Sequence, residues 1–160
     1  MATGVERGDG LVNLGTPLFT CELGGGVDAL STQLVEVRVT PGDELLLVVD
    51  ASGVDAALFA IVWGEPALSG PVGEVSLLEL EWQPLSSLPG DTLAWSSAHG
   101  GELLLGGRPC DAALLMRAPA AIRVRVPTGR ERFVAECGFD ASALPGPLAR
   151  ARCSVYRAPT

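Results

Sequence analysis

The sequence has no lysine, a single histidine, few aromatic residues and no long apolar run. All eleven basic residues are arginine, which we attribute to composition rather than to a chemical requirement. Apolar runs such as residues 45–49 are far too short to span a bilayer. The net charge of −8 argues against a nucleic-acid ligand, because a phosphate-binding protein needs a concentrated basic face. We therefore expect neither nucleic acid nor a membrane as a partner.

Motifs of catalysis and of metal binding are also missing. With His99 as the only histidine, the usual histidine-based metal clusters are excluded. No Gly-x-Ser-x-Gly elbow is present, which argues against a Ser-His-Asp triad. Acidic residues fall mostly at turns or at outward strand positions, where solvation explains them. We expect a protein that is not an enzyme and that has no cofactor.

The four cysteines are widely spaced and include no CxxC pair, so a zinc site is not expected. The first ten residues, expected to be a flexible arm, contain no basic segment followed by an apolar one, and so no visible secretory signal. We expect a cytoplasmic protein with free thiols, or an extracellular one if the chain is a piece of a longer exported protein. Disulfides remain the alternative. The cysteines are Cys21, Cys110, Cys137 and Cys153.

Length and composition predict one domain over residues 11–160, because 160 residues with 48% apolar content can bury a substantial core. Two segments with similar patterns organise the chain, residues 35–50 (VEVRVTPGDELLLVVD) and residues 122–137 (IRVRVPTGRERFVAEC). Each alternates apolar and polar residues and contains a turn with proline and glycine, so we predict two hairpins. The segment 44–50, with its apolar run at 45–49, predicts a strand that is buried on both faces.

Other short segments complete the strand prediction, and five residues at 112–116 leave strand and helical turn both open. Turn-punctuated strands at this spacing are typical of a sandwich or jelly roll. We therefore predict an all-β fold with little helix. The further strand candidates are residues 18–23, 59–63, 74–82, 93–95, 102–105 and 149–156.

Tryptophans are candidates for sugar binding, because an aromatic face packs well on the C–H face of a sugar ring. Trp63 closes an apolar strand and is expected in the core, whereas Trp95 lies beside Ser96, Ser97 and the His99 turn and is the better candidate for exposure. Cys137 should be buried and unreactive, because it shares the inward face of its strand with Phe133.

One calcium site is considered as well. Asp50 and Asp55 flank a glycine-containing loop and could supply two oxygen ligands to Ca²⁺. Two carboxylates are too few to define a site, so no metal is assigned.

Three motifs resemble those of the novel putative carbohydrate-binding module family: Gly106-Gly107, residues 112–122 (AALLMRAPAAI) and residues 133–140 (FVAECGFD). The family's pattern Phe-x-Ala-x-x-Gly-hydrophobic-Asp is matched by Phe133, Ala135, Gly138 and Asp140. In the family's Gly-hydrophobic-Gly-x-His-Ala-x-Ser motif the polar positions differ here. Arg117 stands in place of its histidine and Ala120 in place of its serine, and Ala113 and Leu115 replace its glycines.

This resemblance implies a galactose-binding-like jelly-roll sandwich that binds a glycan. Residues 18–68 resemble the closing strands of the family and residues 74–157 resemble its opening strands, so the order here is permuted. We predict a circular permutation within one chain that brings Leu18 close to Tyr156. The alternative is an exchange of the closing block between chains, which would give a dimer or a larger assembly.

The function predicted from the sequence is a non-catalytic carbohydrate-binding module. The alternative is a protein-interaction or assembly subunit that keeps the sandwich and has lost the sugar site. The ligand is expected among the loops that contain Trp95, His99, Arg117 and Asp140. Arg117 could bind a carboxylate bidentately, so an acidic sugar or an acidic protein surface would suit it.

Overall fold

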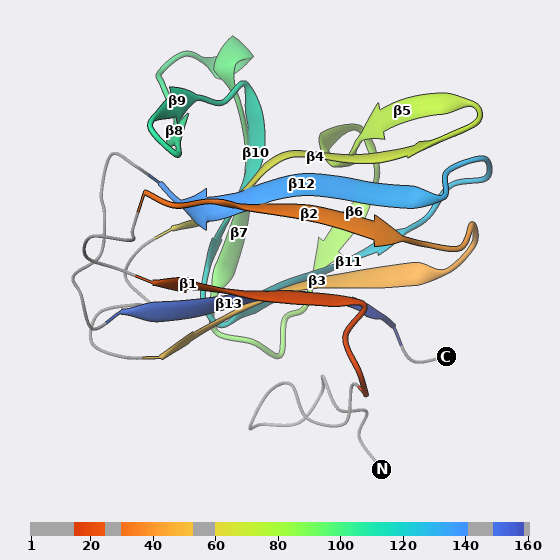
Figure 1. Ribbon diagram of the computed structural model, residues 1–160, viewed down its shortest axis with the longest axis horizontal. Helices are drawn as coiled ribbons and strands as arrows, with labels where there is room; N and C mark the ends of the chain where they lie inside the picture. The colour runs from red at the N-terminus through yellow and green to blue at the C-terminus, as the bar shows by residue number, and fades with distance from the viewer. Residues whose placement is uncertain (1–14, 25–29, 53–59, 141–148, 159–160) are drawn as a thin grey trace.

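The computed structural model describes residues 15–24, 30–52, 60–140 and 149–158, and these form a β-sandwich of antiparallel strands (Figure 1). The predicted arm at residues 1–10 lies outside the described residues. Helical structure in the described ranges consists of two 3₁₀ turns, η4 (Leu77–Glu79) and η5 (Ser97–His99). The all-β prediction with little helix is therefore confirmed. Over these same ranges, no helix combines the length and the apolar character that crossing a membrane requires.

Two sheets form the layers of the sandwich. Sheet 1 has the order β1 (Phe19–Gly24), β13 (Arg150–Arg157), β3 (Glu44–Ser52), β11 (Ala120–Arg125) and β6 (Trp82–Pro84). Sheet 2 has the order β2 (Gln33–Arg38), β12 (Arg132–Phe139), β4 (Ile61–Gly70), β10 (Ala112–Arg117) and β7 (Asp91–Ser96). Two short pieces complete the fold: β5 (Gly73–Ser76) pairs with β4, and β8 (Leu104–Leu105) pairs with β9 (Arg108–Pro109).

The strand pairing is nested from the ends of the chain inward. β1 pairs with β13, β2 with β12, β3 with β11 and β4 with β10. Strands from residues 18–68 and from residues 74–157 therefore alternate over the first four places of each sheet and share one core. The Leu18 amide donates a hydrogen bond to the Val155 carbonyl at 2.7 Å, which confirms that Leu18 lies beside the last strand.

The prediction of two hairpins is wrong. β2 lies in sheet 2 and β3 in sheet 1, and β11 and β12 are divided between the sheets in the same way. Each segment is an arch that crosses the sandwich, and we call residues 33–52 the first arch and residues 120–139 the second arch. The arches pair with each other, and at their turns the Gly42 amide donates to the Val126 carbonyl at 2.9 Å. An arch lets the apolar faces of its two arms cover each other, whereas a hairpin leaves both on one side.

The core follows the predicted alternation along each arm. On β12 every second side chain points inward, and Phe133, Cys137 and Phe139 are fully buried, which confirms the burial of Cys137. Trp63 is 0% exposed, as predicted, and its ring centroid lies 6.1 Å from that of Phe133 in a tilted arrangement. The contact joins β4 to β12 across neighbouring strands of sheet 2 and fills the centre of the sandwich.

The strand β3 is buried on both faces, as its apolar run predicts. Its inward residues belong to the main core, and its outward residues Leu46 and Val48 pack under Leu88 and Ala158 on the outer side of sheet 1. β4 is longer than predicted. The Gly64-Glu65-Pro66 segment does not end it, because a bulge there lets the strand continue to Gly70.

Candidate functional site

The outer side of sheet 2 is partly covered by the segment that carries β8 and β9 (Figure 1). Leu105 of β8 lies against Gly64 of β4 and Gly138 of β12. A Cβ atom at Gly64 would lie 2.4 Å from Leu105 Cδ2, and one at Gly138 would lie 2.8 Å from Leu105 Cδ1. Both positions must therefore be glycine for Leu105 to pack here, which gives Gly138 a structural role.

A hollow of about 400 Å³ opens beside this covered area, and we call it the acidic groove. Among the described residues that line it, the charged side chains are three carboxylates and one guanidinium, so this lining is negative overall. It lies between the β8–β9 segment, the first part of β2 and the bulge of β4. It is lined by Leu34, Gly64, Glu65, Glu74, Leu105, Arg108, Pro109, Cys110, Val134, Ala135 and Glu136.

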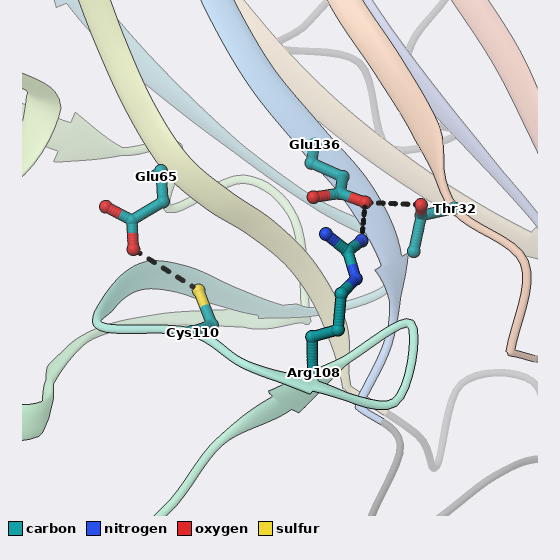
Figure 2. A network of polar contacts seen from close by, with 5 residues as sticks. All are labelled: Thr32, Glu65, Arg108, Cys110 and Glu136. Carbon is teal, nitrogen blue, oxygen red and sulfur yellow. Dashed lines mark hydrogen bonds and ion pairs between the residues drawn. The ribbon is translucent and has the colours of Figure 1, made fainter.

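Glu136 is the acid of the groove that forms an ion pair with Arg108. It points outward from β12, because the inward positions of that strand are Ala135 and Cys137. One of its carboxylate oxygens accepts a hydrogen bond from the Thr32 hydroxyl and an ion-paired hydrogen bond from Arg108 (Figure 2). The Glu136 side chain is 23% exposed, while that of Arg108 is 64% exposed. The guanidinium therefore still faces solvent, where it can donate to a ligand.

Glu65 holds the opposite wall of the groove. It sits in the β4 bulge with a φ of 47°, which is uncommon for a residue other than glycine. Its carboxylate accepts hydrogen bonds from the backbone amides of Asp111, at 2.9 Å, and Ala112, at 3.1 Å. The Cys110 thiol also points to this carboxylate, with Sγ 3.8 Å from Oε2 (Figure 2). Burial raises the pKa of that thiol, so Cys110 stays neutral and can act as a donor.

These groups can hydrogen-bond a polyhydroxylated molecule. Carboxylates accept hydrogen bonds from hydroxyls, and the Arg108 guanidinium donates to sugar or carbonyl oxygens. Leu34 and Val134 add apolar surface to the same hollow. Within the described ranges, no group of three or more His, Cys, Asp or Glu side chains is arranged to hold a metal ion.

The described residues that the sequence predicts as the site lie at two different positions along the strands of sheet 2. Arg117 is the last residue of β10 and Asp140 directly follows β12. The two lie on either side of β4, since the residues before them both pair with Ile61. Trp95 pairs with Ala113, four residues from Arg117, so the two lie about 13 Å apart at ~3.3 Å per residue. Trp95 is half-buried against the cover of sheet 2, and Asp140 bridges to Leu105.

Two of the predicted residues cannot be placed in this geometry. The His99 side chain and Asp55 lie outside the described residues. Asp50 lies on β3, where its carboxylate accepts a hydrogen bond from the Ala51 amide at 3.0 Å. The calcium site and the ligand role of the four predicted residues stay predictions.

The groove residues were not singled out by the sequence. Glu136 lies inside the FVAECGFD motif, but only its outward position on the strand marks it as accessible. Glu65 follows a glycine and precedes a proline, and this pattern indicates the end of a strand rather than a residue that lines a binding site. Arg108 lies 28 residues from Glu136 in sequence. Local patterns carry no signal for such a contact.

Comparisons of the chain with protein-family models, with curated proteins and with solved structures find no match.

Proposed function

We propose that this protein is a non-catalytic binding module of the jelly-roll class, and that a glycan binds in its acidic groove. The observation that carries the proposal is the Glu136–Arg108 pair at a hollow of about 400 Å³. This volume falls in the usual range of small-molecule sites, ~300–1,000 Å³. The nested strand pairing supports the jelly-roll class, in which an antiparallel ribbon is rolled into two sheets.

The lining indicates the kind of glycan. Glu65, Glu74 and Glu136 outnumber Arg108, so the groove repels anionic sugars and suits neutral or amino-substituted ones. No aromatic residue is among the described side chains that line the groove, and Trp63 is in the core. Binding in the groove would therefore rest on hydrogen bonds to hydroxyls, with Leu34 and Val134 contacting C–H groups. An acidic ligand at Arg117 would require a separate site.

The test is a glycan array with neutral, amino and acidic sugars, followed by calorimetry on the ligands found. Glu136→Gln should weaken binding by about tenfold or more, because it removes a charged acceptor and its pairing with Arg108. Glu36→Gln is the matched control. Glu36 is an exposed acid of neighbouring β2, paired with Arg132 and outside the groove lining. An array without binders, or equal binding by both variants, would contradict the proposal.

A second candidate is assembly of the chain with further copies of itself through β2. This strand is at the edge of sheet 2, and its Leu34 side chain is 79% exposed while lining the groove. Exposed edge strands with apolar side chains are ready sites of association. Light scattering after size exclusion should show self-association that Leu34→Glu abolishes. Leu93→Glu on β7, at the opposite edge and 63% exposed, is the control that should change nothing.

A further inference from the structure

Three of the four cysteines meet inside the sandwich. Cys21 of β1 and Cys153 of β13 are direct partners across an antiparallel pair of strands in sheet 1. Cys137 comes from β12 in sheet 2 and belongs to the same buried core. All three are free thiols. The fourth, Cys110, lies apart from them on the outer side of sheet 2.

The register places Cys21 and Cys153 at disulfide distance. Directly opposed residues of antiparallel strands have Cα atoms about 4.5–5.5 Å apart, and disulfides span about 4.4–6.8 Å. Both side chains face the core, because the neighbouring pair Thr20 and Ser154 faces the other way. The hydroxyl oxygens of that pair are 2.9 Å apart, which shows that opposed side chains meet at this point of the two strands.

Access differs among the three thiols. Cys137 and Cys153 are 0% exposed, whereas Cys21 is half-buried. Within the described part of the chain, β1 is the edge strand of sheet 1 and pairs with β13 alone. An edge strand opens at lower free energy than an internal one, and its opening uncovers Cys21 and Cys153 together. A hydrogen bond with Cys153, together with burial, holds the pKa of the Cys21 thiol far above its ordinary value, so its reaction is slow at neutral pH.

We propose that Cys21 and Cys153 are a site of reversible disulfide formation that locks the first described strand to the last. The oxidant is a small-molecule disulfide such as oxidised glutathione. The Cys21 thiolate attacks one glutathione sulfur, forming a mixed disulfide and releasing one glutathione thiolate. The Cys153 thiolate then attacks the Cys21 sulfur and releases the second glutathione. Two protein thiols are thereby oxidised, and one glutathione disulfide is reduced to two thiols.

The bond would close a loop that contains nearly the whole sandwich. Cross-links that close long loops remove the most freedom from the unfolded chain. The oxidised protein should therefore unfold at a higher temperature, and β1 should no longer open independently of β13. The reduced protein keeps a β1 edge that can separate from the sheet.

The experiment treats the full-length native protein with oxidised glutathione at pH 8.5. Remaining thiols are then blocked with iodoacetamide and the peptides are mapped by mass spectrometry. We expect one cross-linked peptide joining Cys21 to Cys153 and a Tm increase of about 5–10 °C, reversed by dithiothreitol. Cys110→Ser is the matched control and should cross-link as the wild type does. Cys21→Ser should show neither the cross-link nor the shift.

Several outcomes would overturn the proposal. One is a glutathione adduct at Cys21 that never resolves into an internal bond. Another is a Cys137–Cys153 link, which would join the two sheets instead of the two terminal strands. A third is a Cys21–Cys153 bond that forms only in denaturant. The wild-type peptide map decides among these, so the result does not depend on whether a cysteine variant folds.

Discussion

The first and second arches have nearly the same sequence pattern and pair with each other, yet they occupy different places in the sandwich. Both strands of the second arch, β11 and β12, have neighbours on each side, while β2 of the first arch is an edge strand. On the outer side of sheet 2, Leu34 of β2 is 79% exposed, whereas Val134 of β12 is half-buried. The same alternation thus contributes differently to stability, because neighbours and not pattern determine burial.

The largest difference should appear when one side chain is removed from each arch. Phe133→Ala on β12 removes a fully buried ring that contacts Trp63, and should lower the free energy of unfolding by about 3–5 kcal/mol. Leu34→Ala on β2 should change it by less than about 0.5 kcal/mol, because the side chain is mostly in solvent. Urea unfolding monitored by tryptophan fluorescence measures both. Similar losses for the two variants would contradict the placement of Phe133 in the core and of Leu34 in solvent.

The turns of the arches provide a second contrast. Gly42 and Gly129 both have positive φ, at 90° and 82°. A Cβ at Gly42 meets no atom within 4 Å, whereas one at Gly129 would lie 2.5 Å from Cγ2 of Val72. Gly42→Ala should cost about 1–2 kcal/mol from backbone strain, and Gly129→Ala about 1 kcal/mol more from crowding against a stiff β-branched side chain.

A double variant checks the cause of that extra cost. Val72→Ala relieves the crowding around residue 129. In that background, Gly129→Ala should lower the free energy of unfolding by only as much as Gly42→Ala does in the wild type. If the extra cost persists in the double variant, the difference between the turns lies in the backbone and not in the contact with Val72.

The next difference between the arches is the effect of alkaline pH on their contribution to stability. Burial raises the pKa of the Cys137 thiol on β12, and the first arch has no cysteine. Below the ordinary value of 9.0 the thiol is neutral in both states. As the pH rises above that value, the unfolded chain loses the proton first, so stability falls toward the raised folded pKa by up to about 1.4 kcal/mol per pH unit.

The absence of lysine simplifies this measurement, because the side chains that titrate between pH 8 and 10 are then mainly the thiols of the four cysteines. Cys137→Ala should reduce the decrease of Tm over that range by the contribution of this one thiol, and Cys110→Ser gives the contribution of a thiol outside the arches. An unchanged slope in Cys137→Ala would show that this thiol titrates alike in the folded and unfolded states.

The smallest effect concerns the ion pairs between the arches. Glu44 of β3 lies 3.6 Å from Arg123 and 3.7 Å from Arg125, and its side chain is 33% exposed. Glu36 of β2 lies 3.2 Å from Arg132 and is 65% exposed. Glu44→Gln should cost more than Glu36→Gln, each less than about 1 kcal/mol, and high salt should remove the difference. Thermal unfolding at low and high salt measures it.

Part of the site could be predicted from the sequence and part could not. The alternation around Phe133 correctly predicts that Cys137 points inward, and it therefore places Glu136 outward. The contact of Glu136 with Thr32 and Arg108 joins residues 104 and 28 positions away, and local patterns do not encode such distances. The sequence does not reveal the bulge at Glu65 either. Glycine and proline are found both at the ends of strands and at bulges, so Gly64 and Pro66 do not distinguish the two.

The sequence by itself determined the all-β class and the direction in which the side chains of its alternating segments point, although the strand predicted at residues 74–82 is divided by the η4 turn. A period of two is a property of each extended segment and needs no partner, which is why the alternation of residues 122–126 predicts the buried face of β11. The tertiary structure alone decided which strands pair. A turn with proline and glycine suits a hairpin and an arch equally, and the arch results because two apolar arms bury more surface against each other than side by side. The acidic groove follows from that decision, since only the nested pairing brings β2, β4 and β12 together under the β8–β9 segment.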